Sequence, residues 1–195
     1  MMEEKQETIN ESIISLRNVT KKYNELAALK DINLDFPKGK IIGLLGPNGS
    51  GKTTMIKILV NLLMNYEGEV LIDGHHPGLV SKKIVSYLPD RDYLSDKWTF
   101  NDAIEYFADF YEDFDKNRAY KLIAELRIPV DVKFKALSKG TREKLQLILM
   151  LSRRAKVYIF DEPIAGVDPV ARDLVFKLIT ENHDEGSTII ISTHL

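Results

Sequence analysis

The segment with the clearest chemical potential is a glycine-rich turn at residues 46–53, which reads Gly-Pro-Asn-Gly-Ser-Gly-Lys-Thr. It follows an apolar run, Ile41–Leu45, and precedes apolar residues at helical spacing. Glycines let the backbone curl so that successive N–H groups point at one anion, and a helix that starts near Gly51 adds the positive end of its dipole. We therefore expect a loop in which Lys52 reaches the β- and γ-phosphates of a nucleotide and the Thr53 hydroxyl ligates Mg²⁺. The expected nucleotide-binding residues of this loop are Gly46, Pro47, Asn48, Gly49, Ser50, Gly51, Lys52, Thr53 and Thr54.

Two carboxylates follow a second apolar run, Val157–Phe160. At the end of the predicted strand, Asp161 could hold Mg²⁺ through water, and Glu162 could orient and deprotonate a water that attacks a γ-phosphate. Paired acids after a strand often serve only a loop or a helix cap. The phosphate loop upstream favours the catalytic interpretation.

The elements that position these residues alternate between short apolar strands and helices, which predicts an α/β fold with a mostly parallel sheet. We expect helices at about 51–63, 100–114, 115–127, 138–152 and 169–183, and strands at 13–19, 29–36, 41–45, 69–72, 157–160 and 188–192. A capping-box pattern, Thr99 with Asp102, starts the second helix. Residues 91–136 are predicted to form a helical insertion, and residues 1–10 a frayed tail.

The composition sets limits on the class of protein. With 195 residues and 44% hydrophobic content, the chain is large enough for one domain with a sizeable core. A net charge of −2 from 27 basic and 29 acidic residues argues against broad electrostatic binding to nucleic acid. Without cysteine, neither disulfides nor thiolate metal sites are possible. The longest apolar stretch, Met55–Met64, is shorter than the roughly 20 residues that a spanning helix needs, and no signal peptide is visible.

Four further motifs resemble those of ATP-binding-cassette proteins. The segment Leu137–Thr141 resembles the L-S-G-G-Q signature, and Ala165–Asp168 is similar to the family's D-loop. His194, after the last predicted strand, resembles the switch histidine, and Tyr23 resembles the aromatic residue that stacks on adenine. With the phosphate loop and the acidic strand, these motifs occur in the family's order over nearly the whole chain.

The resemblance implies one cassette domain over residues 1–195, with a P-loop core, an antiparallel β part and the helical insertion at about 91–136. It implies ATP and Mg²⁺ as ligands, Glu162 and His194 as catalytic residues, and Ser138 and Gly140 as contacts to the ATP of a second cassette chain. The implied function is the ATP-hydrolysing subunit of a transporter, resembling bacterial exporters. This subunit would form a head-to-tail homo- or heterodimer and power a separate membrane permease from the cytoplasmic face of the membrane.

Three features depart from the family pattern. Asp90 stands where the family has glutamine, and an aspartate can ligate Mg²⁺ but cannot donate an amide hydrogen bond. In the signature, Lys139 and Thr141 replace the usual residues. The chain stops one residue after His194, so we expect a truncated form.

Other interpretations stay open at this point. Ser138 could simply cap its helix, and Tyr23 could be a surface residue at a strand end. An aromatic cluster between Tyr106 and Phe114 could be the core of the helical insertion, with some members exposed for a partner. A soluble cassette protein, or a nucleotide sensor with low turnover, is the alternative function.

Overall fold

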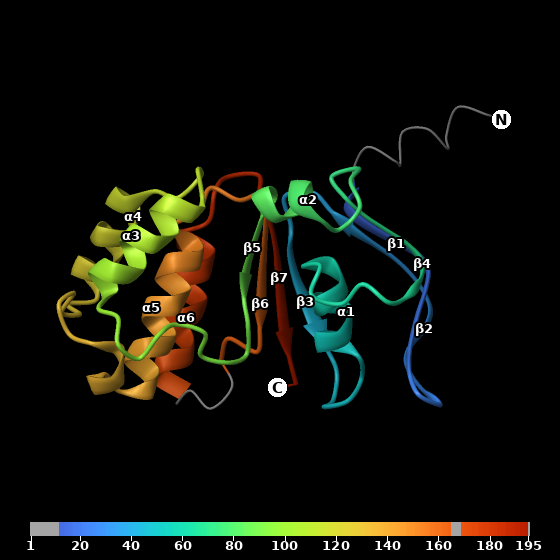
Figure 1. The fold of residues 1–195 in the computed structure, drawn as a ribbon, viewed down its shortest axis with the longest axis horizontal. Helices are drawn as coiled ribbons and strands as arrows, with labels where there is room; N and C mark the ends of the chain where they lie inside the picture. Colours follow the sequence, from blue (N-terminus) through green and yellow to red (C-terminus); the bar gives the residue numbers. More distant parts are fainter. Residues whose placement is uncertain (1–11, 165–168, 195) are drawn as a thin grey trace.

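The computed structural model describes residues 12–164 and 169–194, which form two sheets with helices on both sides of the second (Figure 1). The predicted tail at 1–10 and the predicted D-loop at 165–168 lie outside the described residues.

The first sheet is antiparallel, with strand order β2-β1-β4. Its strands are β1 (Ser12–Tyr23), β2 (Leu26–Pro37) and β4 (Glu67–Ile72). Both long strands extend beyond the predicted runs because they form a hairpin that pairs as far as Tyr23 with Leu26, closed by a left-handed residue, Asn24 (φ 51°). This hairpin places Tyr23 at the far tip of the sheet.

The second sheet is parallel, with strand order β3-β7-β6-β5. Its strands are β3 (Ile41–Leu45), β5 (Val85–Leu88), β6 (Val157–Asp161) and β7 (Thr188–Thr193). Side chains on β6 alternate between two hydrophobic clusters, because successive residues of a strand point to opposite faces. Val157 and Ile159 join the cluster that contains the antiparallel sheet, whereas Tyr158 and Phe160 join the cluster under the helices. Burial on both faces explains the continuous apolar runs in β6 and β7.

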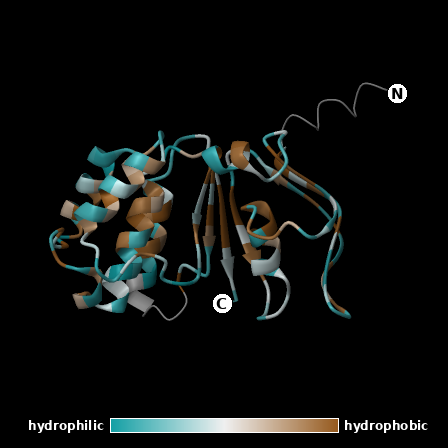
Figure 2. Cartoon of the chain, viewed as in Figure 1, coloured by the Kyte–Doolittle hydropathy of each residue, from teal (hydrophilic) through white to brown (hydrophobic). Residues whose placement is uncertain are grey.

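The helices lie on both sides of this parallel sheet (Figure 1). They are α1 (Lys52–Leu59), α2 (Leu79–Ile84), α3 (Phe100–Phe110), α4 (Lys116–Glu125), α5 (Lys139–Leu151) and α6 (Pro169–Glu181). Helix α1 lies on the side of the antiparallel sheet, and α3 to α6 cover the other side. In Figure 2 the hydrophobic residues concentrate on the central strands and on α5, whose buried half runs from Leu145 to Leu151.

Several helix boundaries differ from the predictions. Helix α1 ends at Leu59 rather than near Leu63, because Asn61 adopts a left-handed conformation (φ 56°) and Leu62 and Leu63 both donate to the Lys57 carbonyl in a closing turn. The short helix α2 was not predicted at all. The capping box at α3 is confirmed: the Thr99 N–H donates to Asp102 Oδ2 (2.7 Å), and the Asp102 N–H donates to Thr99 Oγ1 (3.2 Å).

Helices α3 and α4 occupy the predicted insertion and share one core cluster with α5. The aromatic residue Phe107 lies in this core, whereas Tyr106 and Phe110 are 49% and 67% exposed. The predicted insertion therefore packs as one unit with the helix that follows it. None of the helices in the described ranges has the length and apolar character needed to cross a membrane.

Candidate functional site

The glycine-rich loop joins β3 to α1, and Gly51 is the residue that the geometry constrains most. Its backbone is left-handed (φ 93°), and a Cβ atom built there would lie 2.5 Å from the Ala28 carbonyl oxygen on β2. No side chain fits so close an approach to another backbone. Only glycine therefore lets the loop turn into α1 at this point.

Lys52, the first residue of α1, is held inside the loop. Its side chain is only 8% exposed, and Nζ donates to the carbonyls of Gly46 (2.6 Å) and Pro47 (3.1 Å). The loop thus positions a cation at its own centre. A phosphate oxygen could replace the two carbonyl acceptors without any change in the charge of the lysine.

Asp161 lies below the loop, buried at the carboxyl end of β6. Its Oδ1 accepts a hydrogen bond from Ser192 Oγ on β7 (2.5 Å) and lies 3.4 Å from Thr53 Oγ1. Burial raises the pKa of the Asp161 carboxyl, and the hydrogen bonds from Ser192 and Thr53 oppose this shift. Within the described residues, its second oxygen, Oδ2, is buried with no hydrogen-bond partner.

This arrangement fits a bound magnesium ion. Mg²⁺ prefers hard oxygen ligands and commonly takes one or two carboxylates together with phosphate oxygens. The unpartnered Asp161 Oδ2 and the nearby Thr53 hydroxyl supply such oxygens, and a cation would offset the cost of burying the carboxylate.

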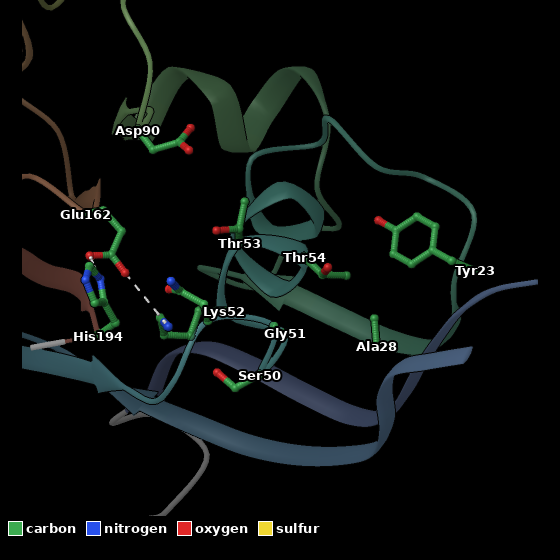
Figure 3. Close-up of a pocket in the computed structure, with 12 residues that line it drawn as sticks. Tyr23, Ala28, Ser50, Gly51, Lys52, Thr53, Thr54, Asp90, Glu162 and His194 are labelled. Atoms are coloured by element: carbon green, nitrogen blue, oxygen red, sulfur yellow. Dashed lines mark hydrogen bonds and ion pairs between the residues drawn. The ribbon is translucent and has the colours of Figure 1, made fainter. Parts of the chain in front are cut away.

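Glu162 follows Asp161 in a left-handed conformation (φ 52°) that turns its side chain toward the loop (Figure 3). The Glu162 N–H donates to the carbonyl oxygen (3.2 Å) and to Oγ (3.0 Å) of Ser192. One carboxylate oxygen lies 3.8 Å from Lys52 Nζ, and the other lies 2.8 Å from Nδ1 of His194. Sequence reasoning missed Ser192, although a serine in the isoleucine-rich strand β7 was a visible signal.

These residues surround one cavity of about 460 Å³ (Figure 3). Tyr23 lies at one end and Glu162 with His194 at the other, with the glycine-rich loop between them. The lining residues are Tyr23, Ala28, Asn48, Gly49, Ser50, Gly51, Lys52, Thr53, Thr54, Asp90, Glu162 and His194. The predicted site residues Gly46, Pro47 and Asp161 do not line the cavity themselves. Gly46 and Pro47 accept hydrogen bonds from Lys52, and Asp161 lies next to Thr53.

Asp90 reaches the cavity from the segment after β5, and its Oδ1 lies 3.9 Å from Arg91 Nε. This segment is attached to α5. Gln146, which is buried on α5, donates from Nε2 to Asp92 Oδ1 (2.6 Å), and Arg142 Nη1 lies 3.5 Å from Asp92 Oδ2. Sequence reasoning missed this connection because it depends on contacts between distant parts of the chain.

Ser138 and Gly140 lie outside the cavity. Ser138 caps α5: its Oγ accepts from the Thr141 N–H (3.3 Å) and lies 2.8 Å from Thr141 Oγ1. Both residues are exposed at the N-terminus of α5. The capping role considered for Ser138 is therefore confirmed, and it leaves the helix N-terminus open to solvent.

A parallel sheet with a phosphate loop at its carboxyl edge, an antiparallel sheet and a helical layer defines an ATPase of the ATP-binding-cassette type. The family model described as "ABC transporter" matches residues 29–165, and the chain belongs to this family of transporter ATP-binding subunits. The expectation of an ATP-hydrolysing cassette is confirmed at the level of the family.

The chain is similar to the ABC transporter ATP-binding protein YtrB of Bacillus subtilis, with 34% identity over 187 residues. That match covers 93% of this chain and 63% of YtrB. The lipopolysaccharide export system ATP-binding protein LptB of Haemophilus influenzae is 30% identical over 194 residues, covering 94% of this chain and 80% of LptB.

Two solved structures have the same fold. An ATP-binding subunit of an ABC transporter superposes with a TM-score of 0.83 at 24% identity, covering 94% of this chain and 80% of that one. A putative ABC transporter ATP-binding protein from Pyrococcus furiosus superposes with a TM-score of 0.81 at 26% identity, covering 93% and 91%. The predicted α/β fold with its antiparallel part is confirmed by these neighbours.

Proposed function

We propose that the chain binds MgATP in the cavity between Tyr23 and Glu162 and hydrolyses it with Glu162 as the general base. The observation that carries this proposal is the Glu162 carboxylate, which lies in the same cavity as Lys52 and is hydrogen-bonded to His194. A carboxylate at this place can accept a proton from water next to a γ-phosphate.

Each residue has a role in this proposal. The loop N–H groups and Lys52 bind the phosphates, and Tyr23 stacks on adenine. Thr53 and Asp161, with Asp90 close by, would hold Mg²⁺, which neutralises phosphate charge when bound. Glu162 accepts a proton from a water molecule as the water oxygen bonds to the γ-phosphorus. The bond between the γ-phosphorus and the bridging oxygen then breaks, which releases ADP and phosphate. The His194 side chain orients Glu162.

Binding is tested by calorimetric titration of ATP into the full-length protein and two lysine variants. Lys52→Ala should weaken ATP binding at least tenfold, because charge-assisted hydrogen bonds to phosphate are lost. Lys57→Ala is the matched control, since Lys57 lies on the same helix but does not line the cavity. An equal loss in both variants would contradict the assignment of the phosphate site.

We also propose that two chains join head to tail and share each site. The support is the exposed N-terminus of α5, where Ser138 and Gly140 lie outside their own cavity. A helix N-terminus with an exposed serine suits a phosphate, and a second chain could bring its ATP there. A homodimer and a heterodimer with a second cassette chain are both compatible with this arrangement.

Light scattering tests the shared site. Glu162→Gln should slow hydrolysis while the phosphate contacts remain, so ATP should shift this variant from monomer to dimer and ADP should not. Adding Ser138→Arg should abolish the dimer, because it places bulk at the facing helix N-terminus. If Glu162→Gln binds ATP and stays monomeric, both alone and with its membrane partner, the shared site is wrong.

A membrane permease is the proposed partner, bound from the cytoplasmic side. An apolar groove of about 360 Å³ runs between the end of α1 and the aromatic side of α3, and Leu62 and Phe110 at its rim are 63% and 67% exposed. Exposed apolar surface of this kind marks interaction sites, and a short helix could lie in the groove. The names of YtrB and LptB, a transporter protein and an export protein, support a role in transport.

Co-purification from the native membrane tests this partnership. Phe110→Asp should lose the membrane partner while ATP affinity stays within twofold, because Phe110 lies outside the nucleotide cavity. Tyr120→Asp, an exposed aromatic residue on α4 that does not line the groove, is the control. Retention of the same permease by Phe110→Asp would contradict the use of this groove.

A further inference from the structure

Lys21 covers one side of the tyrosine at the adenine end of the cavity. Its Nζ lies 5.0 Å from the centroid of the Tyr23 ring, within the range of a cation–π contact. Lys21 is only 8% exposed, whereas its neighbour Lys22 is exposed. The two lysines therefore differ in surroundings although they are adjacent in the sequence.

Among the residues that the structure describes, no carboxylate pairs with Lys21. Within the described part of the chain, no ion pair or hydrogen bond joins its ammonium to another residue. A lysine residue that is largely buried is stabilised by a partner for its charge, and the electron-rich face of Tyr23 is the group that its ammonium contacts. The contact with the ring is thus the interaction that fixes this side chain.

Tyr23 and Lys21 also differ in their position relative to the cavity. Tyr23 lines it, beside Ala28 and Thr54, and Lys21 does not. Figure 3 shows the Tyr23 ring next to these two residues at the end of the cavity away from Glu162. The ring therefore lines the cavity and also contacts a cation that is not part of the cavity lining.

We propose that Lys21 is a positioning residue for the adenine base: it holds the Tyr23 ring so that its uncovered face is available for stacking. This inference rests on the proposed ATP site. A ring held in place before binding loses less rotational freedom when the base arrives. The ammonium also draws π-electron density toward the covered face, which reduces the repulsion between the tyrosine and purine π-clouds.

Two lysine variants and two ligands separate this role from a general effect of charge. Lys21→Met removes the charge and keeps an unbranched apolar stem, and Lys22→Met makes the same change one residue away. Each variant is titrated calorimetrically with ATP and with tripolyphosphate, which has no base. Lys21→Met should weaken ATP binding about fivefold and change tripolyphosphate binding less than twofold, given the usual strength of cation–π contacts. Lys22→Met should leave both affinities within twofold.

Two further variants complete the design. Lys21→Arg should keep ATP affinity within twofold, because guanidinium also binds aromatic faces. The retained tripolyphosphate binding of Lys21→Met shows that its loss of ATP affinity is not a folding defect. In a Tyr23→Ala background, Lys21→Met should have no further effect on ATP affinity, because the ring that transmits the effect is gone.

An equal loss of ATP and tripolyphosphate affinity in Lys21→Met would overturn the proposal, because Lys21 would then act on the phosphates. Unchanged ATP affinity in Lys21→Met would overturn it as well. If the unaltered protein binds tripolyphosphate and ATP equally well, the phosphate site stands and base stacking is wrong. If it binds neither ligand, the proposed ATP site itself is wrong and the role of Lys21 fails with it.

Discussion

Lys52 Nζ lies 3.8 Å from Glu162 Oε1, so the cation of the glycine-rich loop and the carboxylate after β6 are within ion-pair distance across the cavity. Both side chains are largely buried, at 8% and 14% exposure. A γ-phosphate that enters this space meets an attractive charge and a repulsive charge at once. The strength of ATP binding therefore depends on the carboxylate as well as on the lysine.

Neutralising the carboxylate should tighten ATP binding. Glu162→Gln should raise ATP affinity about threefold to tenfold, because it removes like-charge repulsion worth on the order of 1 kcal/mol at a partly buried site. ADP affinity should change less, since ADP lacks the γ-phosphate. Calorimetric titration with both nucleotides measures the difference. A gain of equal size for ATP and ADP would show that Glu162 does not face the γ-phosphate.

Alanine substitutions at two glycines of the loop distinguish the cost of backbone strain from the cost of a steric clash. Both Gly51 (φ 93°) and Gly49 (φ 83°) are left-handed, but a Cβ at Gly51 would lie 2.5 Å from the Ala28 carbonyl oxygen, and a Cβ at Gly49 would meet nothing within 4 Å. Gly49→Ala should lower the free energy of unfolding by about 1 kcal/mol through strain alone. Gly51→Ala should lower it by at least about 2 kcal/mol. Denaturant unfolding checks this order, and equal losses would contradict it.

Asp90 should affect the metal dependence of nucleotide binding. Asp90→Asn should weaken ATP binding in the presence of Mg²⁺ more than in its absence, because a neutral amide is a poorer magnesium ligand. Asp90→Gln, which introduces the family residue, should keep or raise turnover. Titrations with and without Mg²⁺, followed by steady-state phosphate release, provide the test. If neither variant alters the dependence on Mg²⁺, Asp90 is only a loop residue.

Local patterns predicted the parts of the fold and of the site that depend on residues close together in the sequence. The glycine-rich loop, the acids after β6 and the Thr99 capping box each follow from residue types at fixed spacing. By contrast, Ser192 supports Asp161 only because β6 and β7 pair in parallel with these two residues opposite each other. The attachment of Asp92 to Gln146 likewise joins residues 54 positions apart. Such contacts are set by tertiary packing, which a single sequence does not specify.

The secondary structure likewise contains elements that a local pattern predicted and elements that it did not. The runs that became β6 and β7 were predicted because burial on both faces makes them continuously apolar. The six-residue helix α2 was missed because it is too short to display a helical period. Its start at Gly78 uses a hydrogen bond from the Gly78 N–H to Ser81 Oγ (2.8 Å), and its sequence lacks the usual polar residue at the cap.

The capping box of α3 should make the free energy of unfolding depend on pH in the acidic range. The Thr99 N–H and hydroxyl donate to Asp102, and these hydrogen bonds hold the pKa of its carboxyl below its usual range. This contribution to stability is fully present above the unfolded-state pKa of about 3.9 and is lost as the pH falls through the lower folded-state value. Asp102→Asn should therefore flatten the fall in melting temperature below about pH 4. Parallel thermal melts from pH 2 to pH 7 check this, and identical slopes would contradict the assignment.

The central claim is that the chain hydrolyses ATP with Glu162 as the general base. Single-turnover phosphate release from MgATP by the full-length protein tests this claim most directly. The unaltered protein should release phosphate, and Glu162→Gln should do so about 10² to 10⁴ times more slowly, the usual contribution of a general base. The variant should still bind ATP at least as tightly as the unaltered protein. Phosphate release by Glu162→Gln at the unaltered rate would contradict the account.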